Sequence, residues 1–201
     1  MQVMTRISQL SEVADNQLIN MYLDGNERAF VELLGRYQQK IYTSIYMFVK
    51  DHAKAEDIFQ EVFIKIVDTL RKGKYNHEGK FSQWAMRISY NLCVDNFRRN
   101  KRRPTLSPTE DFDIFDVLGS DEDNAEQTMI KSQLHTKIRS LVDQLPDEQK
   151  EVVILRHYAD MSFKEIAALT RVSINTALGR MRYALINIRK LVDEQNIQFQ
   201  N

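Results

Sequence analysis

The sequence contains few of the residues that support several common classes of protein. Its 201 residues include only six glycines and three prolines, which favours long helices over a turn-rich β fold. A single cysteine, Cys93, cannot form an intrachain disulfide. The four histidines show no ligand spacing with one another or with Cys93, so no metal site is predicted. No phosphate-binding glycine loop or nucleophile motif is present, and we expect no catalytic residue, no cofactor, no small-molecule substrate and no enzyme.

Long apolar stretches are also absent. The chain has no run of roughly 18 apolar residues, and its first ten residues lack a hydrophobic signal region. We therefore expect a soluble, cytoplasmic protein. With 43% hydrophobic residues, the chain can build one medium core or two small ones.

Charge is distributed unevenly along a chain whose formal net charge is zero. Residues 71–103 contain ten basic and two acidic residues, whereas residues 104–128 contain eight acidic residues and no basic one. The flanking segments are nearer neutrality, at −3 for residues 1–70 and +3 for residues 129–201. Adjoining segments of opposite charge often accompany nucleic-acid binding.

Hydrophobic periodicity predicts a helical domain over residues 11–103. Asn26 is suited to cap a helix, because its side chain can accept a hydrogen bond from an unpaired helix amide, and Asp51 precedes a second helix. A third helix is expected from Phe81 to the basic cluster that ends at Arg103. Apolar positions at helical spacing predict the inner faces of the first two helices: Phe30, Leu33, Leu34, Tyr37, Ile41, Ile45 and Phe48, then Ile58, Val62, Ile66 and Leu70.

An acidic linker and a second helical domain are expected next. Residues 104–128 contain two prolines, and their self-repulsion and low apolar content predict a flexible segment. The helical pattern resumes over residues 129–195, where Pro146 suits the first position of a helix. Its expected apolar positions before that proline are Ile130, Leu134, Ile138, Leu141 and Leu145. The predicted fold class is all-α, with two small helical domains joined by an acidic flexible linker.

The segment MSFKEIAALTRVSINTALGRMRYAL, residues 161–185, has the pattern of a helix-turn-helix. Ser162 and Glu165 form a capping box for a short helix, and Ser173 can cap a second helix after a tight turn. In this geometry the second helix enters the major groove of DNA. That helix is expected to bury Ala177, Met181, Leu185 and Ile188. The alternative is an ordinary helical pair with a solvated basic face.

Two stripes separate on the helix that is expected from Phe81. An apolar stripe packs inward and consists of Phe81, Ala85, Ile88 and Leu92. A second stripe lies beside it and consists of Lys80, Trp84, Arg87 and Asn91, which Arg98 and Arg99 extend. Cations can follow a DNA backbone, an aromatic ring can stack on a base, and an amide can read an unpaired base edge. The alternatives are a core position for Trp84 with one exposed edge, and a solvated helix end for the arginines.

These motifs, in their order, resemble the extracytoplasmic-function sigma factors of bacterial RNA polymerase. The first domain carries RYQQKIY, AEDIFQEVFIK and KFSQWAMRISYNLCVDNFRR, which are similar to the family's second region. The second domain carries LPDEQKEVVILRHYADMSFKEIAALTRVSINTALGRMRYAL, which is similar to the fourth region. The resemblance covers roughly residues 30–103 and 134–191, and it implies a sigma factor without the globular third region.

The resemblance implies that the chain binds core RNA polymerase and directs it to promoter DNA. The residues implied in polymerase binding are Asp57, Gln60, Glu61 and Phe63, of which the first three form an acidic, polar ridge. The minus-ten element is assigned to Lys80, Trp84, Arg87, Asn91, Arg98 and Arg99, with Asn91 at the mouth of a pocket for a flipped base. The minus-thirty-five element is assigned to Arg156, Phe163, Lys164, Ser173, Asn175, Thr176, Leu178, Gly179, Arg180, Arg182 and Tyr183. For the acidic ridge, a solvated helix face is the alternative.

One position departs from the family pattern, and other classes of protein remain alternatives. Leu178 stands where many relatives carry a basic residue; it cannot donate a hydrogen bond and would suit a thymine methyl group. An anti-sigma factor, membrane-bound for many relatives, is an expected further partner. We expect the linker carboxylates to mimic nucleic acid inside the polymerase. The alternatives are a stand-alone helix-turn-helix regulator, including one of the response-regulator type, and a helical adaptor or anti-sigma protein.

Overall fold

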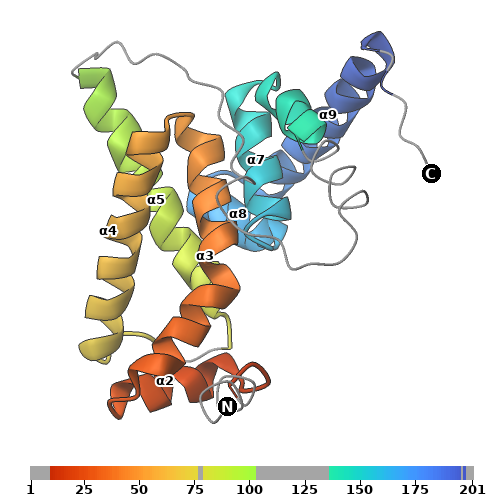
Figure 1. Ribbon diagram of the computed structural model, residues 1–201. Coiled ribbons are helices and arrows are strands. Elements are labelled where there is room, and N and C mark those ends of the chain that lie inside the picture. Colours follow the sequence, from red (N-terminus) through yellow and green to blue (C-terminus); the bar gives the residue numbers. More distant parts are fainter. Residues whose placement is uncertain (1–9, 77–78, 103–135, 196, 198–201) are drawn as a thin grey trace. The chain divides into compact units, whose positions relative to one another are not determined.

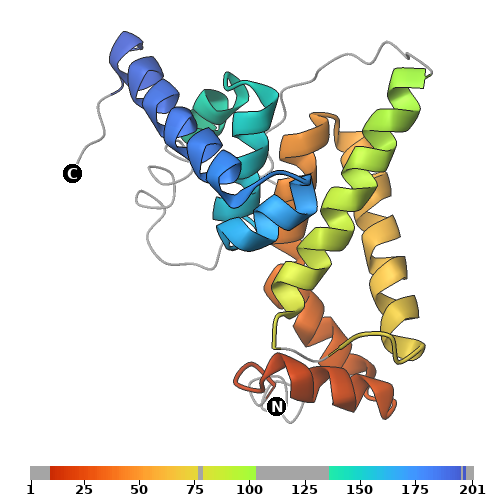
Figure 2. The ribbon, with the colours of Figure 1, turned by 180° about the vertical axis from the view of Figure 1, so that it is seen from behind.

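The computed structural model describes residues 10–76, 79–102, 136–195 and 197. Over these residues every regular element is a helix, which confirms the predicted all-α class (Figures 1 and 2). The chain divides into two compact units. The predicted linker, residues 104–128, lies outside the described residues. Within the described ranges, no helix has the length and apolar character needed to cross a membrane.

The described residues of the first unit form four helices: α2 (Asp15–Leu23), α3 (Glu27–Val49), α4 (His52–Arg71) and α5 (Phe81–Arg102). Helix α3 packs against the other three, and α4 also packs against α5. Figures 1 and 2 show α3, α4 and α5 as three long helices side by side, with α2 across one end. Each long helix therefore keeps one face on a shared core and turns another to solvent.

The predicted cap at Asn26 is confirmed, and Asp51, which precedes the second helix, caps α4. The side chain of Asn26 accepts a hydrogen bond from the backbone N–H of Arg28 at 3.2 Å. The side chain of Asp51 accepts one from the N–H of Lys54 at 3.0 Å. Lys50, between α3 and α4, has a left-handed φ of 52°, which turns the chain sharply after α3.

The apolar stripes predicted for the first unit form its core. Most of their members are fully or nearly fully buried: Leu33, Ile41 and Ile45 of α3, Ile58, Val62, Ile66 and Leu70 of α4, and Phe81, Ala85 and Leu92 of α5. Full burial of one large aliphatic side chain stabilises a fold by about 1.5–3 kcal/mol. The positions of the helices are thus fixed by this apolar core.

The second unit contains residues 136–143, which are helical, followed by α7 (Asp147–His157), α8 (Phe163–Thr170) and α9 (Ile174–Glu194). Helix α9 packs against both α7 and α8, and α7 contacts α8. Pro146 directly precedes α7, whereas it was predicted to be the first residue of the helix. Its carbonyl accepts hydrogen bonds from two amides of the first turn. The buried residues that join these helices are Leu141, Val142, Leu145, Val152, Val153, Ile154, Leu155, Ile166, Ala177 and Ala184.

Two apolar positions of the second unit were predicted wrongly. Leu185 is 44% exposed, and its neighbour Ala184 is fully buried in its place. The inner face of α9 follows a spacing of four, three and four residues from Ala177, which passes through Ala184 and leaves Leu185 about 100° away around the helix. Ile138, also expected in the core, is 37% exposed.

Candidate functional site

The acidic ridge of α4 lies on the side of that helix opposite its buried face. Asp57 and Gln60 are exposed, and Glu61 is partly exposed. Gln60 and Glu61 follow Asp57 by three and four residues, so the three side chains share one side of the helix. Within the ridge, a carboxylate oxygen of Glu61 pairs with Nζ of Lys65 at 3.2 Å.

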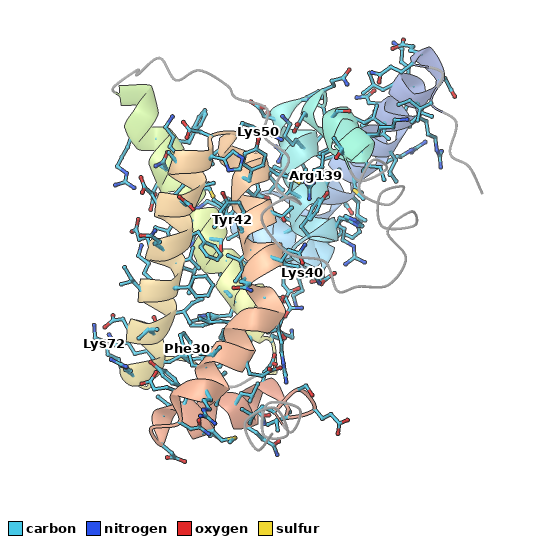
Figure 3. All side chains as sticks on the ribbon, viewed as in Figure 1. Phe30, Lys40, Tyr42, Lys50, Lys72 and Arg139 are labelled. Atoms are coloured by element: carbon cyan, nitrogen blue, oxygen red, sulfur yellow. The ribbon has the colours of Figure 1, made fainter. Side chains whose placement is uncertain are left out.

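The sequence predicted Phe63 among the polymerase-binding residues, but Ile64 is the apolar side chain that lies exposed on the ridge. Phe63 is half-buried on the flank of α4, where its ring lies edge-on against Phe59 at 4.6 Å. Phe59 in turn contacts Tyr42, which lies between α3 and α4 in Figure 3. Ile64 is 68% exposed and follows Gln60 by four residues on the ridge itself. Sequence reasoning missed Ile64, although its spacing from the ridge residues was the available signal.

The polar stripe of α5 is presented to solvent as predicted. Lys80, Arg87 and Asn91 are exposed, as are Arg98 and Arg99 nearer the end of the helix. The apolar stripe beside it is buried, except that Ile88 is half-buried. The first unit therefore displays an amide and several cations along one helix without using them in its core.

Trp84 is both packed and partly accessible. Its ring lies 4.5 Å from the ring of Tyr75 and 5.6 Å from that of Phe81, measured between centroids. Phe81 also contacts Tyr37, whose hydroxyl donates a 2.5 Å hydrogen bond to a carboxylate oxygen of Asp15. Burial, followed by this bond to the Asp15 carboxylate, raises the pKa of Tyr37. These contacts fix the orientation of the tryptophan at the start of α5.

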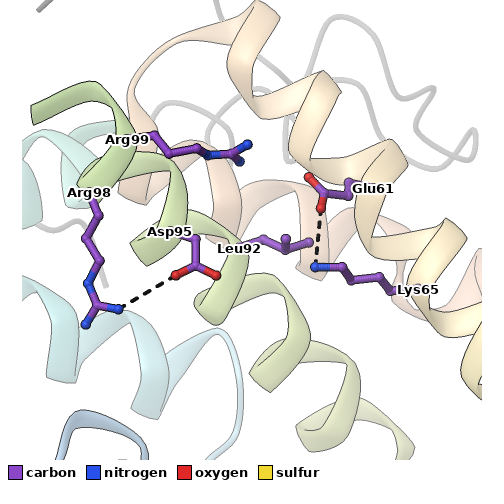
Figure 4. Close-up of a pocket in the computed structure, with 6 residues that line it drawn as sticks. All are labelled: Glu61, Lys65, Leu92, Asp95, Arg98 and Arg99. Carbon is purple, nitrogen blue, oxygen red and sulfur yellow. Dashed lines mark ion pairs between the residues drawn. The ribbon is translucent and has the colours of Figure 1, made fainter. Parts of the chain in front are cut away.

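An open pocket of about 410 Å³ lies between the acidic ridge of α4 and the basic end of α5 in the first unit. Helices α4 and α5 supply its walls, and Figure 4 shows the lining residues: Glu61, Lys65, Leu92, Asp95, Arg98 and Arg99. Besides the Glu61–Lys65 pair, Asp95 pairs with Arg98 at 3.7 Å. The acidic ridge and the basic end of α5 therefore meet in one place.

Helices α8 and α9 form the predicted helix-turn-helix. The hydroxyl of Ser162 accepts from the N–H of Glu165 at 3.3 Å, and the Glu165 carboxylate accepts from the N–H of Ser162 at 2.9 Å, which completes the capping box. Arg171 has a left-handed φ of 58° and ends α8. Ser173 then caps α9 by accepting from the N–H of Thr176 at 3.0 Å. The turn is thus defined by backbone geometry and two serine hydroxyls.

The first turns of α9 present a mixed polar and apolar surface. The exposed members of the predicted set are Ser173, Asn175, Thr176, Leu178, Arg182 and Tyr183. Leu178 is 44% exposed, as a role in contacting a base requires. Gly179 is half-buried, and a Cβ built there would meet nothing within 4 Å. Packing inside this unit therefore does not require a glycine at position 179.

Arg180 is placed differently from Arg182. Its guanidinium lies 3.5 Å from a carboxylate oxygen of Glu151 on α7, and the two side chains are only 24% and 23% exposed. Arg182 is exposed. The structure thus gives Arg180 a role in joining α9 to α7, whereas Arg182 projects from the surface of α9.

Arg156, Phe163 and Lys164 gather near the start of α8. The Arg156 guanidinium lies 5.5 Å from the centre of the Phe163 ring, and its Nη1 donates to the Met161 carbonyl at 2.9 Å. Lys164 is exposed beside them. A stacked and hydrogen-bonded guanidinium keeps a fixed direction, which suits the binding of a phosphate group.

Comparison with known proteins assigns a family to each half of the chain. The model of sigma-70 region 2 matches residues 33–103, and that of sigma-70 region 4 matches residues 135–182. The chain is 30% identical over 176 residues to the RNA polymerase sigma-H factor of Pseudomonas aeruginosa, covering 86% of this chain and 90% of that protein. It is 27% identical over 183 residues to the ECF RNA polymerase sigma factor SigW of Bacillus subtilis, covering 89% and 97%.

Solved structures share the fold at lower sequence identity. The structure of CnrH in complex with the cytosolic domain of CnrY aligns with a TM-score of 0.59 and 21% identity, covering 90% of this chain and 99% of that one. The sigma factor RpoE from Bartonella quintana, solved in complex with the anti-sigma factor NepR, aligns with a TM-score of 0.60 and 16% identity, covering 82% and 96%.

Proposed function

Because this chain belongs to the extracytoplasmic-function sigma factors, which bind core RNA polymerase and direct transcription initiation at specific promoters, we propose a division of this work between its two units. The ridge on α4 docks on core polymerase. The polar stripe of α5 holds the minus-ten element as a single strand. The start of α9 reads the minus-thirty-five element as a duplex. An anti-sigma factor holds the chain inactive, by analogy with RpoE and NepR.

The observation that carries the docking proposal is an exposed ridge that the fold does not need. Asp57 and Gln60 are exposed, and the carboxylate of Glu61 pairs with a lysine that is itself half-exposed. Ile64, 68% exposed, supplies an apolar side chain within this polar row. An apolar contact surrounded by charged groups is typical of the energetically important part of a protein interface. This composition favours docking over the solvated-face alternative.

The stripe on α5 has the three kinds of group that an unpaired strand needs. Arg87 can follow the backbone, Trp84 can stack on a base with its accessible edge, and Asn91 can read a base through its amide. The packing of Trp84 against Tyr75 and Phe81 fixes its ring before DNA arrives. Less side-chain freedom is then lost on binding.

The start of α9 suits a duplex. Asn175 and Thr176 are exposed and polar, and the first amides of the helix favour a nearby phosphate. The hydroxyl of Ser173 is engaged in the helix cap, so this residue positions α9 and leaves base contacts to its neighbours. Exposed Leu178 would meet a thymine methyl group.

Replacing Asp57, Gln60 and Glu61 together by alanine tests the docking proposal. The variant should lose about 2–5 kcal/mol of affinity for core polymerase, because cations of the partner would be left without their carboxylates. Its free energy of unfolding should stay within about 0.5 kcal/mol of the wild-type value, since the ridge lies outside the core. Affinity for core is measured by titration with labelled chain, and stability by denaturant unfolding.

A matched control removes two carboxylates elsewhere in the first unit. Glu12 and Asp24 are both exposed, so the variant that carries Glu12→Ala and Asp24→Ala changes net charge equally without touching α4. It should bind core polymerase like the wild-type chain. Normal core binding by a well-folded triple variant would contradict the docking assignment.

A further inference from the structure

We propose that Lys65 completes a phosphate-binding subsite with Arg98 and Arg99 in the pocket between α4 and α5, and that Glu61 fills this subsite in the free protein. The ligand is a backbone phosphate of the promoter strand. The proposal rests on the proposed function, which places Glu61 at the polymerase and the two arginines at DNA. It adds a residue of α4 to the DNA-binding surface and links the two binding events.

The pocket brings together cations from two helices around one carboxylate. Nζ of Lys65 lies 3.2 Å from a carboxylate oxygen of Glu61. Figure 4 shows Arg99 extending from α5 toward the same carboxylate, while Arg98 turns toward Asp95. The buried side chain of Leu92 lines the pocket between the Glu61–Lys65 pair and the Asp95–Arg98 pair. Glu61 therefore stands where an external anion would meet Lys65 and Arg99 together.

The local charge favours an anionic ligand once Glu61 is engaged elsewhere. Three cations and two carboxylates line the pocket, a balance of +1. If a cation of the polymerase pairs with Glu61, the remaining pocket groups carry +2. The Glu61 and Lys65 side chains are 43% and 49% exposed, and ion pairs this exposed are weak and exchange partners readily.

This arrangement couples the binding of polymerase to the binding of DNA. Glu61 cannot pair fully with a polymerase cation while it neutralises Lys65. Core binding consequently frees the phosphate subsite, and an occupied subsite frees Glu61 for core. Such coupling is reciprocal, so each partner should tighten the binding of the other by the same factor.

The decisive experiment measures the salt dependence of promoter binding by holoenzyme that contains Lys65→Gln. On a promoter fragment with a single-stranded minus-ten segment, the slope of log affinity against log salt should fall by about 0.7, which corresponds to one lost phosphate contact on a single strand. The control is Lys72→Gln, because Lys72 forms the same kind of pair, with Asp68 at 2.7 Å, at the end of α4 and outside the pocket. The control should keep the wild-type slope. Equal slopes for both variants would overturn the proposal.

A second measurement tests the exchange of Glu61. In the free chain at low salt, Glu61→Gln should raise the affinity for a single-stranded oligonucleotide roughly two- to fivefold, as expected for release of an exposed ion pair. The increase should vanish when Lys65→Gln is also present. An equal increase in both backgrounds would mean that general charge, and not the Lys65 subsite, is responsible.

Core affinity separates this proposal from the docking assignment. Lys65→Gln should bind core polymerase at least as well as wild type, because it releases Glu61 from its pair with Lys65. If its core affinity is normal and its salt slope is unchanged, the phosphate subsite is wrong while the docking ridge stands. If Glu61→Gln binds core normally, the docking role of Glu61 is wrong, and the coupling of the two binding events fails with it.

Discussion

The first unit carries its proposed binding residues on the solvent faces of long helices, whereas the second carries several of them at the starts of α8 and α9. Asp57, Gln60 and Asn91 project from solvent faces of helices whose positions are set by a separate apolar core. In the second unit, the cap at Ser173 and the left-handed backbone of Arg171 direct the polar start of α9. Folding and binding are therefore separable in the first unit, and they share residues in the second.

Loss of a helix cap should distinguish the two units most clearly. Ser173→Ala should cost about 1 kcal/mol of stability, because the N–H of Thr176 loses its acceptor. Affinity for minus-thirty-five duplex should fall as well, since the frayed turn contains Asn175 and Thr176. Denaturant unfolding and duplex titration measure the two effects.

The matched cap in the first unit is Asp51, which accepts from the N–H of Lys54. Asp51→Ala should cost a similar amount of stability while leaving the affinity for minus-ten single strand unchanged. If Asp51→Ala weakened strand binding as much as Ser173→Ala weakens duplex binding, the contrast between the units would be lost.

Local signals in the sequence predicted most of the fold. Spacing of apolar residues located α3, α4 and α5, and capping residues located the starts of α3, α4, α8 and α9, because each of these signals depends only on neighbours along the chain. The exposed polar sides of α4, α5 and α9 followed from the same spacing. The acidic ridge and the α5 stripe are therefore recognisable as surfaces from the sequence alone.

The features that were missed depend on residues far apart in the sequence. Arg180 was grouped with the surface cations, yet its partner Glu151 lies on another helix. The cluster of Glu61 with Arg99 requires the packing of α4 against α5. Leu185 was predicted to be buried where Ala184 is, because a small residue gives a weak hydrophobic signal although it allows helices to approach closely. Periodicity alone gives neither of the two juxtapositions between helices, whereas the spacing of four, three and four residues from Ala177 does pass through Ala184.

Two arginines of α9, Arg180 and Arg182, offer a sharper comparison inside the second unit. Arg182→Ala should reduce the salt slope of duplex binding by about 0.9, because an exposed phosphate contact is lost. Arg180→Ala should mainly lower stability, by up to about 1 kcal/mol after allowance for solvent, since it removes the partner of Glu151. Salt titrations of duplex binding and unfolding curves separate the two outcomes. A larger slope change for Arg180→Ala would place Arg180 at the DNA.

The smallest effect is expected on the reaction rate of the Cys93 thiol. This rate tests whether the core of the first unit is independent of its binding surfaces. The side chain is 4% exposed, and burial raises the pKa of the thiol to about 12 from an ordinary value of 9.0. Only the thiolate reacts readily with disulfide reagents, so the native thiol should react very slowly at pH 8. The unfolded chain should react quickly.

The raised pKa of Cys93 also fixes the direction of a pH effect. The protonated thiol contributes stability that is fully present below pH 9, where the thiol is protonated in both states. Between pH 9 and about 12 the unfolded chain releases this proton and the folded chain keeps it, so the contribution falls as pH rises.

Replacement of ridge residues on α4, or of Lys65, should leave the slow reaction of the thiol unchanged, because these side chains do not support the core around it. Faster modification in those variants would show that the surface and the core of the first unit are coupled after all.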